Sequence, residues 1–215
     1  MQNLLITTSF APDAVIIGNG DFPTAEIPLA AISNARYVCC CDGAAASYIS
    51  RGFVPDAIVG DGDSLDEVFK ERYRDILHII DEQDDNDQTK ATRHCLSMGF
   101  RSIAYVGATG KREDHTLGNI SLIERYRNEM GIDAVMLTDG YFVAAEGDAE
   151  FETFAGQQVS IFNFSCSRIE SSGLKWNSYA YGSWWQGTLN EATGNSVKFY
   201  ADGRYLVFRT YKGKI

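Results

Sequence analysis

Short apolar segments that close on glycine or aspartate recur through the first two thirds of the sequence, and this pattern constrains the fold most. They lie at residues 14–20, 36–43, 56–63, 76–81, 102–110 and 134–140. Continuous apolar runs of this length are typical of strands buried on both faces of a parallel sheet. Between them, helical patterns occupy residues 44–51, 65–74, 88–98 and 116–128. The alternation predicts an α/β domain with a Rossmann-like, mostly parallel sheet and helices.

The pattern changes near residue 146. Beyond it, aromatic and β-branched segments such as 158–164 and 204–211 are separated by turns rich in Gly, Ser and Asn. Short segments of this kind, without a helical pattern, predict a smaller all-β domain, a sandwich or barrel. We therefore expect two domains, an α/β catalytic domain at residues 1–146 and a β-domain at residues 147–215.

Negative charge is concentrated in one stretch of the expected α/β domain. Between Asp42 and Asp87 the chain has 13 acidic and four basic residues, and the net charge of the whole protein is −10. The acids form clusters at residues 41–46, 60–65 and 83–91, and the first two follow strand-like segments directly. Carboxylates gathered at strand ends repel one another unless a cation joins them. Mg²⁺ prefers such oxygen ligands and usually binds with substrate phosphates, so the sequence predicts metal-dependent phosphate chemistry.

The charge and the apolar pattern disfavour other classes of protein. A net charge of −10 argues against a nucleic-acid binder, which needs a basic surface. No apolar run approaches the roughly 20 residues that span a bilayer, and residues 1–10 lack the basic segment and cleavage site of a signal peptide. We expect a cytoplasmic protein that binds neither nucleic acid nor membrane.

The first two acidic clusters predict a metal site at the sheet edge. Asp42, Asp61 and Asp63 would project beyond the carboxyl ends of the strands, where ligands of α/β sheets collect. Asp61 and Asp63 share one side of an extended chain, so both can reach one ion. Ser64 can cap the following helix or bind a phosphate oxygen. The string 60–64 on its own is equally typical of a polar turn with a helix cap.

The third cluster, at residues 83–91, opens a helix. Asn86 or Asp87 is the expected N-cap, and Lys90 lies about one turn further on, on the side of Asp87. A capped helix with an internal ion pair explains the segment equally well when it is considered alone. Its recurrence beside two other acidic strand ends favours metal and phosphate binding.

Residues 107–119 follow a strand-like segment with small residues and then Lys111, Arg112, Asp114 and His115. Glycine-rich strand-to-helix turns bind phosphates through backbone N–H groups and the helix N-terminus. The segment is not a P-loop, because GxxxxGK[ST] is absent. Arg112 can instead pair with Glu113 or Asp114, and we interpret His115 as a supporting residue. In the β-domain, Trp176 in a polar context is a candidate ligand or interface anchor, and Asn190 is a further polar candidate.

Taken in order along the chain, these motifs resemble the thiamine pyrophosphokinase (thiamine diphosphokinase) family over nearly the whole sequence. The similarity rests on a strand leading into Asp42, then on residues 55–64, 83–91, 107–119 and 172–176. It implies transfer of a pyrophosphoryl group from ATP to the hydroxyl of thiamine, giving thiamine diphosphate and AMP. It also implies Mg²⁺ as cofactor and a homodimer with active sites between the subunits.

The resemblance assigns roles residue by residue. The catalytic group comprises Asp61, Asp63, Asp87, Lys90 and Arg112. The metal ligands are Asp42, Asp61, Asp63 and Asp87, and a carboxylate such as Asp87 is the expected proton acceptor. The substrate-binding group comprises Asn19, Asp42, Ser64, Gln83, Asp114, His115, Trp176 and Asn190, of which Gln83, Trp176 and Asn190 are expected to contact thiamine.

Two positions depart from the family pattern. Leu189 stands where the family usually has Ser before Asn190, and Asn177–Ser178 stands where the family usually has Pro-Leu or Asn-Leu after residues 172–176. Both departures fall on the thiamine side and allow a changed substrate ring. Two alternatives stay open: another Mg²⁺-dependent phosphotransferase or nucleotide hydrolase, and a non-catalytic protein that binds thiamine or a nucleotide.

Overall fold

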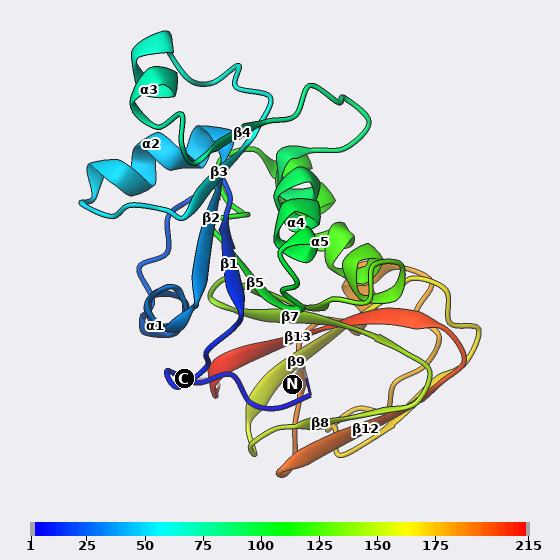
Figure 1. Ribbon diagram of the computed structural model, residues 1–215. Helices are drawn as coiled ribbons and strands as arrows, with labels where there is room; N and C mark the ends of the chain where they lie inside the picture. Colours follow the sequence, from blue (N-terminus) through cyan, green and yellow to red (C-terminus); the bar gives the residue numbers. More distant parts are fainter. Residues whose placement is uncertain (1–2, 214–215) are drawn as a thin grey trace. The chain divides into compact units, whose positions relative to one another are not determined.

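The computed structural model describes residues 3–213 (Figure 1). Contacts between residues divide this part of the chain into two compact units. The first unit comprises residues 8–122, and the second comprises residues 3–7 together with 123–213. The strands and helices of each unit are described in turn.

The first unit is built on a parallel sheet, as the sequence predicts. Its strands follow the spatial order β5-β1-β2-β3-β4, and each pairs with its neighbours in parallel. They are β1 (Ala14–Ile17), β2 (Tyr37–Cys41), β3 (Ala57–Gly60), β4 (Leu77–Ile79) and β5 (Ser102–Val106). β1, β3 and β5 are buried throughout, whereas the edge strand β4 is largely exposed. The continuous apolar runs thus mark the centre of the sheet.

Helices connect the strands. They are α1 (Glu26–Asn34), α2 (Asp42–Ser50), α3 (Glu67–Arg72), α4 (Asp87–Ser97) and α5 (Glu113–Asn128). α1 and α2 lie on one face of the sheet and α4 lies on the other (Figure 1). α2, α3, α4 and α5 agree with the predicted helical patterns, but α1 was not predicted.

The sequence of α1 hides its helical character. Pro28 is the third residue of the helix, where backbone N–H groups have no partner within the helix, so proline is tolerated. Its N-cap is Ala25, which provides no side-chain hydrogen bond. Pro28, Ala31 and Ile32 form the buried face at helical spacing. An apolar segment with an internal proline and no capping residue gives little signal for a helix.

The second unit is an antiparallel β region, which confirms the predicted class of the C-terminal part. One set of strands follows the order β11-β9-β13-β7-β6 and the other follows β10-β12-β8. The first set is β6 (Asp133–Leu137), β7 (Gly140–Glu146), β9 (Gln157–Asn163), β11 (Asn190–Glu191) and β13 (Arg204–Gly213). The second set is β8 (Ala149–Glu152), β10 (Ile169–Ser172) and β12 (Ser196–Ala201), and a short 3₁₀ helix, η1, spans Trp184–Gly187.

The two strand sets of the second unit pack through aromatic side chains. The ring of Phe199 on β12 lies 5.5 Å from that of Tyr205 on β13. Arg209 on β13 is fully buried, and its Nη1 donates to the carbonyl oxygen of Glu152 at 2.6 Å. Side chains alternate between buried and accessible along β9 and β12, as expected for strands with one face on a core.

The chain passes from the first compact unit to the second between residues 122 and 123. The sequence instead predicts a domain boundary between residues 146 and 147. β6 and β7 belong to the second unit by their contacts, and they pair with each other in an antiparallel manner. The domain boundary itself stays a prediction. Within residues 3–213, none of the helices combines the length and apolar character that crossing a membrane requires.

Candidate active site

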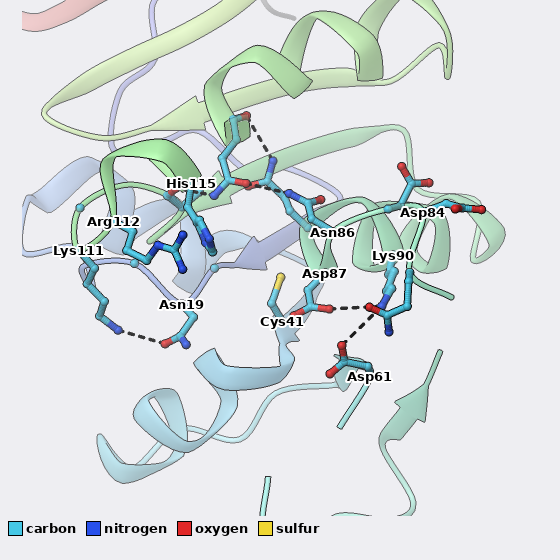
Figure 2. Close-up of a pocket in the computed structure, with 18 residues that line it drawn as sticks. Asn19, Cys41, Asp61, Asp84, Asn86, Asp87, Lys90, Lys111, Arg112 and His115 are labelled. Carbon is cyan, nitrogen blue, oxygen red and sulfur yellow. Dashed lines mark hydrogen bonds and ion pairs between the residues drawn. The ribbon is translucent and has the colours of Figure 1, made fainter. Parts of the chain in front are cut away.

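A cavity of about 590 Å³ lies in the first unit, beside the carboxyl ends of its parallel strands (Figure 2). The residues predicted for the site that line it are Asn19, Asp61, Gln83, Asp87, Lys90, Arg112 and His115. Asp61 and Asn19 follow strands β3 and β1, and Asp87 opens α4. The topology therefore brings together side chains that are up to 96 positions apart because parallel strands end at one edge.

Two glycine-rich turns form the floor of the cavity. The turn after β1 donates from Gly18 N to Val106 O, at the end of β5, at 2.8 Å, and from Gly20 N to Gly107 O, in the turn after β5, at 2.6 Å. A Cβ atom on Gly20 would lie 2.0 Å from the carbonyl oxygen of Thr109. The two backbones approach so closely that residue 20 has no room for a side chain.

The acidic side of the cavity holds a buried lysine. Lys90 is 2% exposed, and its Nζ lies 3.7 Å from Asp87 Oδ1 and 4.0 Å from Asp61 Oδ2. Burial raises the pKa of Asp87, the negative charge of Asp61 raises it further, and Lys90 partly offsets both effects. Two carboxylates thus share one buried cation, which leaves excess negative charge at this wall.

Asp42 is buried at the first residue of α2 and is not part of the cavity lining. A Cβ on Gly60 would lie 2.4 Å from the Cβ of Asp42, so glycine at the end of β3 makes room for it. Asp42 Oδ2 accepts a hydrogen bond from Ser64 N at 3.1 Å, while Oδ1 has no hydrogen-bond partner among the described residues. Burial raises the pKa of Asp42, and the charges of Asp61 and Asp63 add to the effect.

Arg93 of α4 holds the acidic loop that precedes this helix. Arg93 Nη1 donates to Glu82 Oε2 at 2.9 Å, and Arg93 also forms an ion pair with Asp85. These contacts hold the segment that carries Gln83 and Asp84, both of which line the cavity. Asp84 is exposed and adds a further negative charge that the sequence analysis did not assign to the site.

The opposite side of the cavity is basic (Figure 2). Lys111 has a left-handed backbone, with φ 56°, and its Nζ donates to Asn19 Oδ1 at 3.1 Å. Arg112 donates from Nε and Nη2 to the two oxygens of Asp114, at 3.1 and 2.6 Å. This pair lowers the pKa of Asp114 to about 2. His115, next in the chain, is exposed and lines the cavity.

The sequence allows either Asn86 or Asp87 as the N-cap of α4, and the structure decides between them. Asn86 is the N-cap, and its Oδ1 accepts from Thr89 N at 3.0 Å. Asn86 Nδ2 donates to Asn119 Oδ1 on α5 at 3.0 Å, and Asn119 Nδ2 donates to Ala108 O at 2.8 Å. Asn119 lines the cavity but was not predicted, because a lone asparagine inside a helical pattern carries no signal of such a contact.

Other predicted site residues lie outside the cavity lining. Asp63 and Ser64 are exposed in the turn before α3, and Asp114 faces Arg112. Trp176 and Asn190 belong to the second unit. There, Asn190 is 5% exposed, accepts from Trp176 N at 3.2 Å and donates to Trp176 O at 2.7 Å. The roles of these residues toward substrate stay predictions.

The donor set suits Mg²⁺ in its chemistry. Asp42 and Asp61 offer hard oxygen ligands, and the buried Oδ1 of Asp42 lacks the partner that such an atom requires. Within residues 3–213, no group of three His, Cys, Asp or Glu side chains already converges in the manner of a closed metal site. Mg²⁺ commonly binds through one or two carboxylates plus water and substrate phosphates, so an open arrangement fits this ion.

Comparison with known proteins decides the family. Residues 29–135 match the family model for "Thiamin pyrophosphokinase, catalytic domain", and residues 140–208 match that for "Thiamin pyrophosphokinase, substrate-binding domain". The chain belongs to the thiamine pyrophosphokinase family. Most of the cavity lining, from Cys41 to Asn119, falls within the segment that matches the catalytic domain of thiamine pyrophosphokinases.

Individual thiamine pyrophosphokinases are similar in part of their sequence. The chain is 36% identical over 98 residues to "Thiamine pyrophosphokinase 1" of Oryza sativa subsp. japonica, a match that covers 40% of this chain and 36% of that protein. It is 31% identical over 103 residues to "Thiamin pyrophosphokinase 1" of Caenorhabditis elegans, covering 44% and 42% of the two chains. The chain thus spans less than half the length of these curated relatives.

Solved structures share the fold over nearly the whole chain. The thiamine pyrophosphokinase of Bacillus subtilis has a TM-score of 0.72 at 20% identity, over 92% of this chain and 98% of that one. Yeast thiamin pyrophosphokinase has a TM-score of 0.73 at 15% identity, over 91% and 85%. The mixed α/β unit followed by an antiparallel β region is therefore the fold of thiamine pyrophosphokinase structures.

Proposed function

We propose that the protein transfers a pyrophosphoryl group from ATP to the hydroxyl of thiamine, giving thiamine diphosphate and AMP in a Mg²⁺-dependent reaction. The observation that carries this proposal is the opposite charge of the two sides of the cavity. Asp61 and Asp87 with the buried Lys90 lie on one side, and Lys111 and Arg112 lie on the other (Figure 2). Family membership supports the choice of thiamine as acceptor.

The reaction joins the hydroxyl oxygen of thiamine to the β-phosphorus of ATP. The bond between that phosphorus and the α,β-bridging oxygen breaks, and AMP leaves with this oxygen. Asp87, whose carboxylate lines the cavity, is proposed to accept the hydroxyl proton. Phosphoryl transfers depend chiefly on positioning and on stabilisation of charge at the phosphate oxygens.

The residues of this chain divide that task. Lys111 and Arg112 exchange their present partners, Asn19 Oδ1 and Asp114, for phosphate oxygens of ATP. The turn at residues 107–110 offers backbone N–H groups ahead of α5. Asp42, Asp61, Asp63 and Asp87 would hold Mg²⁺. When bound, the ion would neutralise charge on the phosphate oxygens.

Thiamine and the second subunit complete the proposal. Gln83, Trp176 and Asn190 are each proposed to contact thiamine. We also propose a cytoplasmic homodimer with active sites at the subunit interface. Light scattering of the purified protein tests the dimer, and a monomer that forms product at full rate would contradict it.

A product assay tests the function. Purified protein is incubated with ATP and Mg²⁺, with and without thiamine, and AMP and thiamine diphosphate are measured. The proposal predicts equal amounts of both products and no AMP without thiamine. AMP or ADP release that ignores thiamine would instead identify a nucleotide hydrolase. Binding of both ligands without any product would identify a non-catalytic binding protein.

A further inference from the structure

A chain of two asparagine amides crosses one wall of the cavity. Asn86 Oδ1 accepts from Thr89 N at 3.0 Å, Asn86 Nδ2 donates to Asn119 Oδ1 at 3.0 Å, and Asn119 Nδ2 donates to Ala108 O at 2.8 Å. Gln88 Nε2 additionally donates to the backbone oxygen of Asn119 at 3.4 Å. The chain links three separate elements, the start of α4, the helix α5 and the turn after β5.

The groups at the two ends of the chain fix its direction. A backbone N–H can only donate and a carbonyl oxygen can only accept, so Thr89 N requires the oxygen of Asn86 and Ala108 O requires the nitrogen of Asn119. Each amide then presents the complementary atom to the other. Neither amide can turn over without placing two donors or two acceptors against each other, which would remove the hydrogen bond between the two side chains.

The chain joins the two sides of the cavity. Asn86 precedes Asp87, and Lys90 lies one turn later on the same helix. Ala108 belongs to the turn that continues into Lys111 and Arg112, and that turn is itself bonded to residues 18–21. Asn86, Ala108 and Asn119 all line the cavity. A displacement at either amide therefore changes the separation between the carboxylates and the basic turn.

We propose that Asn119, acting through Asn86, is a positioning residue that sets the distance between the Asp87–Lys90 wall and the Arg112 turn for nucleotide binding. This inference rests on the proposed function for its kinetic readout, but nucleotide affinity tests it without that function. The hydrogen bonds of the Asn119 side chain join it to Asn86 on one side of the cavity and to Ala108 on the other, so the proposed effect arises from the geometry of the two walls.

The test is a double-mutant cycle with Asn86→Ser and Asn119→Ala. Serine caps a helix about as well as asparagine, so N86S keeps the cap of α4 and removes only the donor to Asn119. We expect each single variant to raise the KM for ATP and the Kd for ATP with Mg²⁺ about tenfold. The KM for thiamine should stay within twofold. The double variant should bind ATP no more weakly than either single variant, because each single substitution already breaks the hydrogen-bond chain.

A second pair of variants provides the controls. Asn86→Asp also caps the helix but places an oxygen against Asn119 Oδ1, so it should weaken ATP binding at least as much as N86S. Asn128 lies on the same helix and donates to Glu124 Oε1 at 2.9 Å, one turn back, so Asn128→Ala should leave ATP affinity unchanged.

The outcomes are distinguishable. Losses that multiply to about 100-fold in the double variant, or ATP affinity of N86D equal to that of the unmodified protein, would overturn the positioning role. If N119A fails to fold, N86S and N86D still decide the matter through the Kd for ATP. If the protein forms no thiamine diphosphate but the Kd values follow the predicted non-additive pattern, the proposed function falls and the positioning role stands.

Discussion

The ammonium group of Lys90 lies 3.7 Å from the carboxylate of Asp87, one turn earlier on α4, and its side chain is 2% exposed. A lysine is rarely so buried unless it is paired. Asp61 Oδ2, 4.0 Å away, supplies a second partner from the end of β3. The pairing keeps one positive charge inside a wall that is otherwise acidic, and the first prediction follows from it.

Replacing Lys90 by methionine should lower kcat/KM by about 10²–10³-fold, the range seen when one charge-stabilising group is removed. Because Lys90 offsets the rise in the pKa of Asp87, the pKa of Asp87 should increase further in the variant. Activity assays and carboxyl NMR titration measure the two effects. A variant with normal activity would show that Lys90 serves only to neutralise its neighbours. Lys198→Met, which removes an exposed lysine paired with Glu150 on β8, is the matched control.

Replacing Asp42 by asparagine should stabilise the metal-free protein at pH 7. The pKa of Asp42 is raised in the folded state, so the folded protein favours the protonated carboxyl. Ionisation therefore costs stability as the pH rises above the unfolded value of about 3.9. The asparagine amide would keep an oxygen for Ser64 N and place a donor where Asp42 Oδ1 has no partner among the described residues.

Thermal unfolding in EDTA measures this change. The gain in stability of D42N should be present at pH 7. It should be absent at pH 3, where Asp42 is protonated in both the folded and the unfolded state. Asp63→Asn, in an exposed turn, should change stability by less than about 0.5 kcal/mol. Adding Mg²⁺ with ATP should raise the melting temperature of the unmodified protein more than that of D42N. A lower melting temperature of D42N at pH 7 would contradict the claim that burial disfavours the ionised form of Asp42.

Replacing Arg112 by lysine should raise the KM for ATP about tenfold and leave the KM for thiamine unchanged. Arg112 engages both oxygens of Asp114 through two nitrogens, and lysine cannot reproduce this two-point contact with a carboxylate or a phosphate. The low pKa of Asp114, about 2, means that this pair stays ionised from pH 4 to pH 10 and adds no step to the pH profile there. Steady-state kinetics with either substrate varied measures the split. An unchanged KM for ATP would remove Arg112 from the nucleotide site.

Replacing Gly20 by alanine should destabilise the protein by about 1–3 kcal/mol. The new Cβ would lie 2.0 Å from the carbonyl oxygen of Thr109, so the two turns beneath the cavity would have to separate. Gly118→Ala is the matched control. Nothing lies within 4 Å of a Cβ at Gly118, which is inside α5, so alanine should stabilise the helix by about 0.5–1 kcal/mol. Urea unfolding measures both changes, and equal stabilities would contradict the close approach of the turns.

Much of this site could be predicted because its chemistry follows the strand ends. Asp61 and Lys90 stand in short strings whose position beside apolar segments places them at one sheet edge. The positive charge of the turn that carries Arg112 could likewise be predicted, because this turn follows a strand-like segment. Their pairing with particular partners could not, since Arg112 had a choice between Glu113 and Asp114 that only the fold decides.

The contacts that position these groups were not predictable. Asn119 acts through distant backbone and amide groups, and α1 lacks the capping residue that marks most helices. Asn190 illustrates the same limit. Both ends of its amide bond the backbone of Trp176, a pairing that its residue type does not indicate, and its role toward thiamine stays a prediction. Long-range hydrogen bonds have no period and no spacing, so a single sequence does not reveal them.

The fate of the γ-phosphate of ATP tests the central claim most directly. The protein is incubated with Mg²⁺, thiamine and ATP labelled at the γ-position, and the products are separated. The account predicts that the label appears in thiamine diphosphate, with an equal amount of unlabelled AMP. Labelled thiamine monophosphate with ADP, or labelled inorganic phosphate, would show transfer of a single phosphoryl group or hydrolysis, and either result would contradict it.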